Sequence, residues 1–360
     1  MANIVDYIKV HGGYRINRAA PFNDLDAMVL SRFSYLPFHK IDLKRKETIL
    51  SIAKKMSMLE TEDFAWPDDA ELIKTMGLSS RFASLKTTSY VRKSSAEVTE
   101  QFMAITIHIN KFRMFISYIG TDSSLHGWRE DFNLALMNEI PSQISGVKYL
   151  RSVARRYFWK KMYLGGHSKG GNIAMYSAIM IRDLYQNRII SVCSLDGPGM
   201  TKKIVEQDLG HSVMPRIKNF IPQDSIIGRL LNHAETFEVV KSNAKNFWQH
   251  NIYSWEFDLK NKCPVRSEAT SKSDFADKTI GLWIQSATQE QREVFVDLVF
   301  RILETSKLGT PVDVAAAGLK AVPTLFKAYR TLTHDDRKVI TTFIKKLFIS
   351  AYKAHRESKK

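Results

Sequence analysis

The segment Gly166-His167-Ser168-Lys169-Gly170 constrains the fold of this chain more than any other feature. It lies between the apolar, strand-like run 161–164 and the segment 173–184, whose apolar residues recur with helical spacing. A serine in G-x-S-x-G at such a junction is typical of a turn so sharp that the serine backbone is strained and its Oγ stands above a sheet. The glycines are needed because side chains two residues either side of the serine would collide.

Alternating strands and helices surround this turn. Strands are predicted at 100–110, 113–120, 161–165, 189–196, 216–221 and 236–241, and helices at 127–140, from Pro141 and at 170–185. In the first strand, Ile105, Ile107 and Ile109 share one face, as in a half-buried strand, whereas the second strand is apolar almost throughout. The pattern predicts a mainly parallel sheet with helices on both of its faces.

The chain is predicted to have three parts. Residues 1–95 form an N-terminal helical and covering segment, in which Asn23 is a helix N-cap and 61–95 is irregular. Residues 96–270 form the α/β core. Residues 271–360 form a helical appendage. Its helices begin after the Thr288/Gln291 capping box, at Thr310-Pro311 with a break at Pro323, and near Asp335.

Composition narrows the class of protein. The formal net charge is +16, but the Lys and Arg residues are scattered except near the end of the sequence, and no zinc-finger, RNP-type or leucine-zipper pattern accompanies them. We therefore expect a solvated basic surface and no specific nucleic-acid partner.

Two cysteines make no disulfide framework, Asp6 interrupts any signal-peptide core, and no run is apolar enough to cross a bilayer. We expect a cytoplasmic protein, and the sequence does not indicate its oligomeric state.

A nucleophilic serine needs a base, and the base needs an acid that orients it. After Ser168, one predicted strand ends at Asp196 and the next at Asp224; the second position favours Asp224 as the acid, with Asp196 as the alternative. Order and loop position favour His250 as the base, with His233 as the alternative.

An oxyanion would need two backbone N–H donors. The residue after the serine, Lys169, supplies one in this kind of turn, and a loop after an upstream strand supplies the other. Gly120 permits a turn in such a loop, and Thr121 or Asp122 can present the amide.

Several motifs, taken in order, resemble a known family. The segments YIGTDSSLHGWREDF, GGHSKGGNIAMYSA, SLDGPG and IPQDSIIG, followed by VVKS and QHNIYSW, are similar to a bacterial α/β-hydrolase family of unknown function related to the class 3 (fungal-type) lipases. NIVDYI and PFNDLDAMVLSRFSYL match its opening, so the resemblance covers about residues 3–258. It implies an α/β-hydrolase fold.

The resemblance also implies roles for individual residues. They are Ser168 as nucleophile, Asp224 as acid, His250 as base, Thr121 in the oxyanion loop, and Trp128 and Asp131 as braces of that loop. The chain departs from the characterised lipases at Ile119, where they usually carry arginine, and at Lys169, where they usually carry leucine. Lys169 could favour an anionic substrate, but we expect it to reach solvent or pair with an acid.

These features predict a serine hydrolase of carboxylic esters, lipase-like or esterase-like, that uses no metal or organic cofactor. The alternatives are an inert serine in a packing turn and a non-catalytic hydrolase-like binding protein. In the last helix, Val339, Ile340, Phe343, Leu347, Phe348 and Tyr352 share one side, with lysines nearby. Packing on the hydrolase body is the favoured role of this helix, and peripheral contact with an anionic membrane is the alternative.

Overall fold

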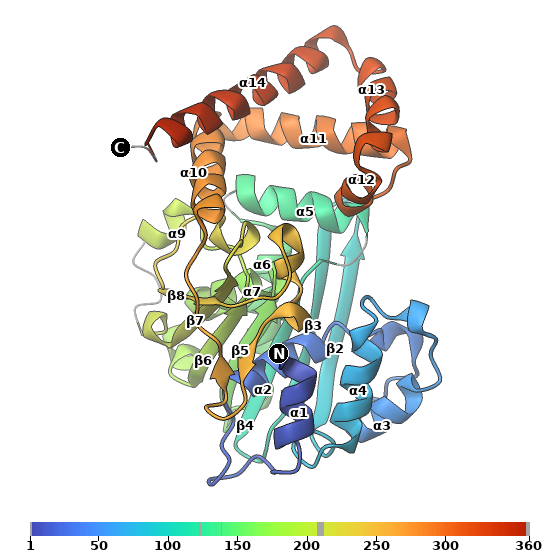
Figure 1. The fold of residues 1–360 in the computed structure, drawn as a ribbon. Coiled ribbons are helices and arrows are strands. Elements are labelled where there is room, and N and C mark those ends of the chain that lie inside the picture. The colour runs from blue at the N-terminus through green and yellow to red at the C-terminus, as the bar shows by residue number, and fades with distance from the viewer. Residues whose placement is uncertain (1, 122–123, 138, 207–211, 358–360) are drawn as a thin grey trace. The chain divides into compact units, whose positions relative to one another are not determined.

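The computed structural model describes residues 2–121, 124–137, 139–206 and 212–357 (Figure 1). The chain divides into two compact units. The sheet unit contains residues up to 93, 102–120 and 142–270, and the helical unit contains 94–101, 121–141 and the chain from 271 onward. Each unit is described by itself.

An eight-stranded sheet is the centre of the sheet unit, with its strands in sequence order. The strands are β1 (Lys46–Thr48), β2 (Lys86–Ser95), β3 (Glu100–His108), β4 (Arg113–Ile119), β5 (Lys161–His167), β6 (Ile189–Leu195), β7 (Ile217–Pro222) and β8 (Phe237–Val240). The pairs β1–β2 and β3–β4 are antiparallel, whereas β4 to β8 are parallel (Figure 1). A mainly parallel sheet with helices around it is the α/β-hydrolase arrangement that the sequence predicted.

Helices bury both faces of this sheet. The helices of the unit are α1 (Ile4–His11), α2 (Asp24–Phe33), α3 (Ile49–Met56), α4 (Asp68–Leu78), α6 (Pro141–Arg156), α7 (Lys169–Met180), α8 (Asp183–Gln186) and α9 (Lys202–Glu206). Along β4, Phe115 joins the apolar cluster formed with α1 to α4, while Met114 and Ile116 join the cluster formed with α6 and α7. This alternation explains why β4 is apolar throughout. It also holds for β3, which is buried on both faces rather than half-buried as predicted.

Short elements complete the sheet unit. They are the strand pair β9 (Phe257–Asp258) and β10 (Cys263–Pro264), and the 3₁₀ helices η1 (Phe38–Lys40), η2 (Thr61–Asp63), η3 (Met214–Arg216), η4 (Ile227–Arg229), η5 (Asn246–His250) and η6 (Ile252–Ser254). The element η5 follows β8 and carries one of the predicted site residues.

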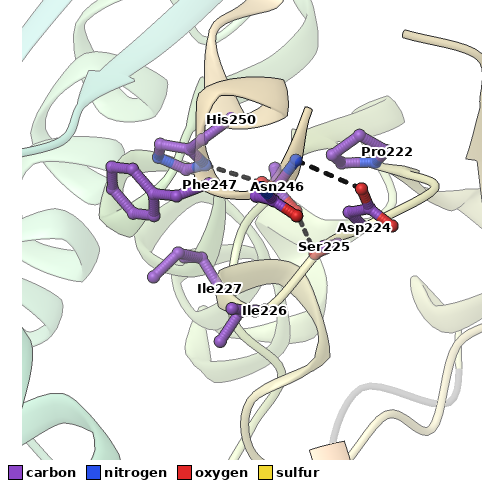
Figure 2. A pocket seen from close by; sticks show the side chains of 9 residues that line it. Pro222, Asp224, Ser225, Ile226, Ile227, Asn246, Phe247 and His250 are labelled. Atoms are coloured by element: carbon purple, nitrogen blue, oxygen red, sulfur yellow. Dashed lines mark hydrogen bonds and ion pairs between the residues drawn. The ribbon is translucent and has the colours of Figure 1, made fainter. Parts of the chain in front are cut away.

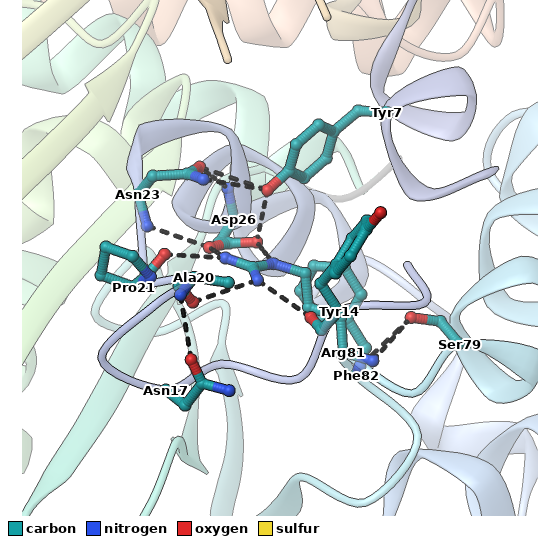
Figure 3. A network of polar contacts seen from close by, with 10 residues as sticks. All are labelled: Tyr7, Tyr14, Asn17, Ala20, Pro21, Asn23, Asp26, Ser79, Arg81 and Phe82. Carbon is teal, nitrogen blue, oxygen red and sulfur yellow. Dashed lines mark hydrogen bonds and ion pairs between the residues drawn. The ribbon is translucent and has the colours of Figure 1, made fainter. Parts of the chain in front are cut away.

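Two buried ion pairs hold the N-terminal helices in place. Arg81 donates from Nε and Nη2 to the two oxygens of Asp26, at 2.6 and 2.5 Å, and also to backbone carbonyls of the loop 14–21 (Figure 3). Arg32 and Asp69 form the second pair, at 2.7 and 2.5 Å. Both arginines have side chains that are only 3% exposed, so removing one partner would leave a charge buried in low dielectric. The two pairs therefore fix α2, α4 and the segment around Arg81 to one another.

The helical unit contains α5 (Leu125–Leu136) and the helices after residue 270. The latter are α10 (Ser271–Gln285), α11 (Gln289–Ser306), α12 (Pro311–Ala317), η7 (Gly318–Ala321), α13 (Val322–Arg330) and α14 (His334–Glu357). The Thr288/Gln291 capping box is present at the start of α11, as predicted. Trp128 and Phe132 of α5 pack against the α11 cluster of Val296, Phe300 and Leu303.

The structure also departs from the sequence-based organisation. The segment 61–95, predicted to be irregular, contains α4 and β2, and the helix predicted over 170–185 is divided between α7 and α8. The predicted N-terminal segment up to residue 93 shares the sheet unit with most of the predicted core, whereas 94–101 and 121–141 fall in the helical unit with the residues from 271 onward. The N-terminal helices join the core through one apolar cluster, which they share with Ile105, Phe115 and Tyr163 of the sheet.

Candidate active site

Ser168 occupies the turn between β5 and α7, with φ 57° and ψ −133°. A Cβ added to Gly166 would lie 2.4 Å from the Gly170 backbone, and one added to Gly170 would lie 2.3 Å from the Tyr118 carbonyl oxygen. No real Cβ tolerates such distances, so both positions require glycine. The strained serine and the close approach of helix and strand confirm the sharp turn predicted from the motif.

His250, at the end of η5, is paired with Asp196. Its Nδ1 lies 2.6 Å from Asp196 Oδ2, and the Asp196 side chain is 1% exposed. The other oxygen, Oδ1, accepts hydrogen bonds from Ser225 Oγ and from the Gly228 N–H. A carboxylate held in this way accepts a hydrogen bond from Nδ1–H, so the lone pair of the neutral imidazole is on Nε2. Asp196 directly follows β6 and has a positive φ of 48°.

Neighbouring residues connect this pair to the turn at Ser168. The Ser168 N–H donates to the carbonyl of Leu195, which precedes Asp196, at 2.9 Å. The His167 ring lies against the His250 ring, with centroids 4.4 Å apart, and His167 Nε2 lies 2.8 Å from the His250 carbonyl oxygen. Contacts made by the residues next to them in the sequence thus hold Ser168, Asp196 and His250 at the carboxyl ends of β5 and β6.

His167 is a fixed, neutral support of the site. Burial, the charge of His250 and the charge of Arg32 all lower the pKa of His167 well below its ordinary value. The neutral ring donates Nε2–H to the His250 carbonyl, because a carbonyl oxygen can only accept. No role was predicted for His167 from the sequence, although it directly precedes Ser168 in the motif.

Tyr35 is a second residue that sequence reasoning missed. Its hydroxyl donates to the His167 carbonyl at 2.7 Å and accepts from the Gly120 N–H at 2.7 Å. One phenol therefore joins the end of β4 to the end of β5. No local pattern could reveal this contact, because Tyr35 is 132 residues from His167.

Asp224 does not contact His250 as expected. Its Oδ2 accepts from the Asn246 N–H at 3.1 Å and from Gln249 Nε2 at 3.0 Å, while Oδ1 accepts from Thr270 Oγ1 at 2.6 Å. The structure therefore corrects the predicted pairing: Asp196, the alternative acid, faces the imidazole, and Asp224 holds the η5 loop that carries it. The sequence could not distinguish them, because both follow parallel strands.

A small cavity lies between these two carboxylates. It is lined by Asp196, Asp224, His250, Phe247 and three further side chains contributed by 225–227, with Pro222 and Asn246 at its edge (Figure 2). Phe247 stacks on His250 with ring centroids 5.9 Å apart. Apolar side chains therefore meet the imidazole on this side.

His233, the alternative base, belongs to a different pair. Its Nδ1 lies 2.7 Å from Glu235 Oε1, and Asn219 Nδ2 donates to the same oxygen at 3.2 Å. The Glu235 side chain is 3% exposed. In this structure His250 and not His233 adjoins the residues around Ser168, which agrees with the preference drawn from position in the loop after β8.

The two predicted oxyanion donors fall in different units. Lys169 begins α7 beside Ser168, and its side chain is 1% exposed, so it does not reach solvent as one expectation held. Thr121 belongs to the helical unit, where its hydroxyl donates to Asp131, in keeping with a bracing role for Asp131. Asp122, the other candidate for this amide, lies outside the described residues.

The site offers acid–base and nucleophilic groups. Over the part of the chain that the structure describes, no three His, Cys, Asp or Glu side chains are grouped as metal ligands would be. The free cysteines are Cys193, which is buried, and Cys263. A strained serine, an imidazole whose Nε2 can accept a proton and a carboxylate on Nδ1 are the components of nucleophilic acyl transfer.

Comparison with known proteins gives one family and several distant structures. The sequence model of the Mbeg1-like family matches residues 76–301. No curated protein matches the sequence significantly.

Solved structures with local similarity include several lipases. They include M37 lipase (15% identity over 59% of this chain and 70% of the lipase, TM-score 0.37), a Rhizomucor miehei lipase propeptide complex (16%, 44% and 57%, 0.32), and lipase II from Rhizopus niveus (15%, 61% and 83%, 0.34). The chain thus spans less than two thirds of the Rhizomucor lipase.

Proposed function

The chain belongs to the Mbeg1-like family, and from this premise we propose that it is a serine hydrolase that cleaves carboxylic esters. The proposed nucleophile is Ser168, the base His250 and the acid Asp196. The amide of Lys169 is a proposed oxyanion donor. Asp224 is proposed to position the base rather than to act as the acid.

One observation carries the proposal. The 2.6 Å contact from Asp196 to His250 Nδ1 occurs beside a serine held in a strained turn. A buried carboxylate on Nδ1 fixes the tautomer whose Nε2 accepts a proton, and it stabilises the imidazolium that forms. Such a turn presents the serine Oγ beyond the carboxyl ends of the strands. Neither feature is needed for a packing turn.

In the proposed acylation step, His250 Nε2 takes the proton of Ser168 Oγ–H as Oγ bonds to the acyl carbon. Charge moves to the carbonyl oxygen, which backbone N–H donors stabilise because they are already oriented. When the intermediate collapses, the acyl carbon–oxygen bond breaks, and His250 Nε2–H protonates the departing alkoxide.

In the deacylation step, water is the nucleophile. His250 Nε2 takes a proton from water as its oxygen attacks the acyl carbon, and the bond to Ser168 Oγ then breaks. Ser168 recovers its proton from His250, so the protein returns to its starting state. The neutral His167 cannot replace His250 here, because its Nε2 is already bonded to the His250 carbonyl.

The surroundings of the imidazole favour an apolar acyl group. Ile226, Ile227 and Phe247 line the cavity at His250 (Figure 2). Contact of these side chains with an acyl chain would remove apolar surface from water at both partners. The cavity itself has room for about one water molecule, so the acyl chain would lie along the exposed parts of Ile226 and Phe247. We therefore propose an ester of a carboxylic acid with an apolar chain as the substrate class.

The test is covalent labelling with a fluorophosphonate probe, followed by a panel of p-nitrophenyl esters of increasing chain length. We expect stoichiometric labelling that Ser168→Ala abolishes and that Ser57→Ala preserves. Ser57 is a suitable control because it is exposed at the end of α3, where its hydroxyl donates to the Lys54 carbonyl.

Two outcomes would count against the proposal. Folded wild-type protein that takes no label would favour the alternative, a non-catalytic binding protein with a hydrolase fold. Labelling that persists in Ser168→Ala would assign the nucleophile elsewhere. Circular dichroism of each variant separates loss of chemistry from loss of fold.

A further inference from the structure

The helix α14 carries an unusual distribution of charge. Between residues 337 and 356 it contains six Lys and Arg residues and no Asp or Glu. These residues are Arg337, Lys338, Lys345, Lys346, Lys353 and Arg356. Among the residues that the structure describes, none of the six takes part in an ion pair, although Lys346 donates to the Ser286 carbonyl. The ion pairs of α14 lie at its two ends, at Asp336 and Glu357.

One face of α14 is packed inside the helical unit. Its buried residues are Ile340, Phe343, Ser350 and Ala354. The Phe343 ring stacks on Phe295 of α11 with centroids 4.4 Å apart. This part of the apolar side predicted from sequence is therefore an internal contact.

Val339 and Leu347 of the predicted apolar side are partly buried, whereas Phe348 and Tyr352 are exposed. Phe348 is 71% exposed and Tyr352 is 64% exposed, and Ile344 continues the same i, i+4 row at 47%. Ile349 lies beside this row and is 54% exposed. Four large apolar side chains therefore stand in solvent on a helix whose only charges, between residues 337 and 356, are positive.

An anionic lipid surface accounts for both properties. Apolar side chains of an interfacial helix enter the boundary between headgroups and acyl chains, while lysines extend their charges to the headgroups. A second copy of this chain would bring like charges together. Nucleic acid would pair with the cations but leave the exposed Phe348 and Ile349 unexplained. The described chain has no helix with the length and apolarity that a membrane span requires, so contact along one helix face is the relevant mode.

We propose that the exposed face of α14, formed by Ile344, Phe348, Ile349 and Tyr352 with Lys345 and Lys353, binds the surface of an anionic bilayer. The binding does not depend on ester hydrolysis, so it goes beyond the proposed function.

The experiment is co-sedimentation of the full chain with two kinds of vesicle. One kind is phosphatidylcholine alone, and the other is phosphatidylcholine and phosphatidylglycerol in equal parts. Ser168→Ala protein is measured in parallel, so that lipid cleavage does not alter the vesicles. We expect binding to the anionic vesicles only. The double variant Lys345→Gln/Lys353→Gln should bind about 25-fold more weakly, at about fivefold for each lysine. Phe348→Ser/Ile349→Ser should bind about tenfold more weakly or worse.

Matched controls use exposed residues of the same kind elsewhere. Leu184→Ser removes a side chain that is 72% exposed, and Lys74→Gln removes a cation that is 71% exposed. Phe158→Ser tests a rival cluster, in which Phe158 (72% exposed) lies beside Trp159 and several basic residues. We expect all three controls to bind as the wild type does.

The outcomes are decisive in each direction. Equal binding to neutral and anionic vesicles, no binding to either, or a loss of binding with Phe158→Ser but not with the α14 variants would overturn the proposal. Binding to DNA that displaces the vesicles and survives Phe348→Ser/Ile349→Ser would assign the face to nucleic acid. Hydrolysis of a short soluble ester, measured on the same samples, reports on the proposed function separately, since no α14 residue belongs to that site.

Discussion

The sheet unit contains two histidine–carboxylate pairs, and they differ in what surrounds them. His250 is 2.6 Å from Asp196 and His233 is 2.7 Å from Glu235, and both carboxylates are almost fully buried. The His250 pair adjoins the strained serine turn, through His167 and Leu195. The His233 pair is packed against Asn219 and Phe237. Both histidines have a buried carboxylate partner, but only the His250 pair has a strained serine beside it, as the proposed mechanism requires.

The largest expected difference is in activity when each histidine is replaced. His250→Gln should lower kcat for a p-nitrophenyl ester by about 10,000-fold or more, because it removes the proposed acceptor of the Ser168 proton. His233→Gln should leave kcat near that of the wild type. Similar losses in two folded variants would contradict the distinction between the pairs.

The second prediction concerns the two carboxylates that line the cavity. Asp196→Asn should lower kcat by about 1,000-fold to 10,000-fold, because an amide N–H would face Nδ1 and put the imidazole proton on Nε2. Its folding is checked by its thermal unfolding midpoint.

Asp224→Asn is the matched change, and a smaller effect is expected. It weakens the hydrogen bonds to Asn246 and Thr270 and so loosens the η5 loop. We expect about a tenfold loss in kcat, on the scale of a misplaced catalytic group rather than an absent one. If Asp224→Asn were the more damaging change, His250 would pair with Asp224 in solution, and the acid proposed here would be wrong.

The smallest predicted effect is on stability, at the His233 pair. Burial acts to raise the pKa of Glu235, but the hydrogen bond and charge of His233 outweigh it, so the pKa is lowered from 4.5. The unfolded chain therefore binds a proton at a higher pH than the folded chain. This carboxylate contributes stability above about pH 4.5, and the contribution is lost as the pH falls through the lowered folded value.

Glu235→Gln should accordingly reduce the free energy of unfolding by about 1–3 kcal/mol at neutral pH. It should also make stability decline less steeply below pH 4.5 than in the wild type. Urea unfolding at neutral and acidic pH measures both. A variant with an unchanged acid dependence would show that this pair does not hold its charge in the folded state.

Much of the fold could be predicted because its signals are local. The turn at Ser168 follows from Gly166 and Gly170, and the start of α11 follows from the Thr288/Gln291 capping box. The segments that were missed, α4 and β2, have no strong period of their own. Their stability comes from distant partners such as the Arg32–Asp69 ion pair.

The candidate site was predictable in its residue types but not in its pairing. Chain order favoured His250 over His233, and the structure brings His250 to the serine turn. Chain order also favoured Asp224, yet Asp196 contacts the imidazole. Which of two neighbouring carboxylates an imidazole meets depends on the path of the η5 loop, which Asp224 itself holds through contacts 22 to 46 residues away.

The sequence by itself determined the strand–serine–helix turn, the parallel sheet around it and the positive charge of the last helix between residues 337 and 356. The turn and the sheet depend on residue spacing and on the absence of side chains at Gly166 and Gly170. The charge of the last helix depends only on which residues it contains. Only the tertiary structure decided that Asp196 partners His250, that Tyr35 and His167 support the site, and that Phe348 and Tyr352 stay exposed while Phe343 is buried. Those outcomes depend on contacts between segments far apart in the chain, and no local pattern encodes the direction in which such segments approach.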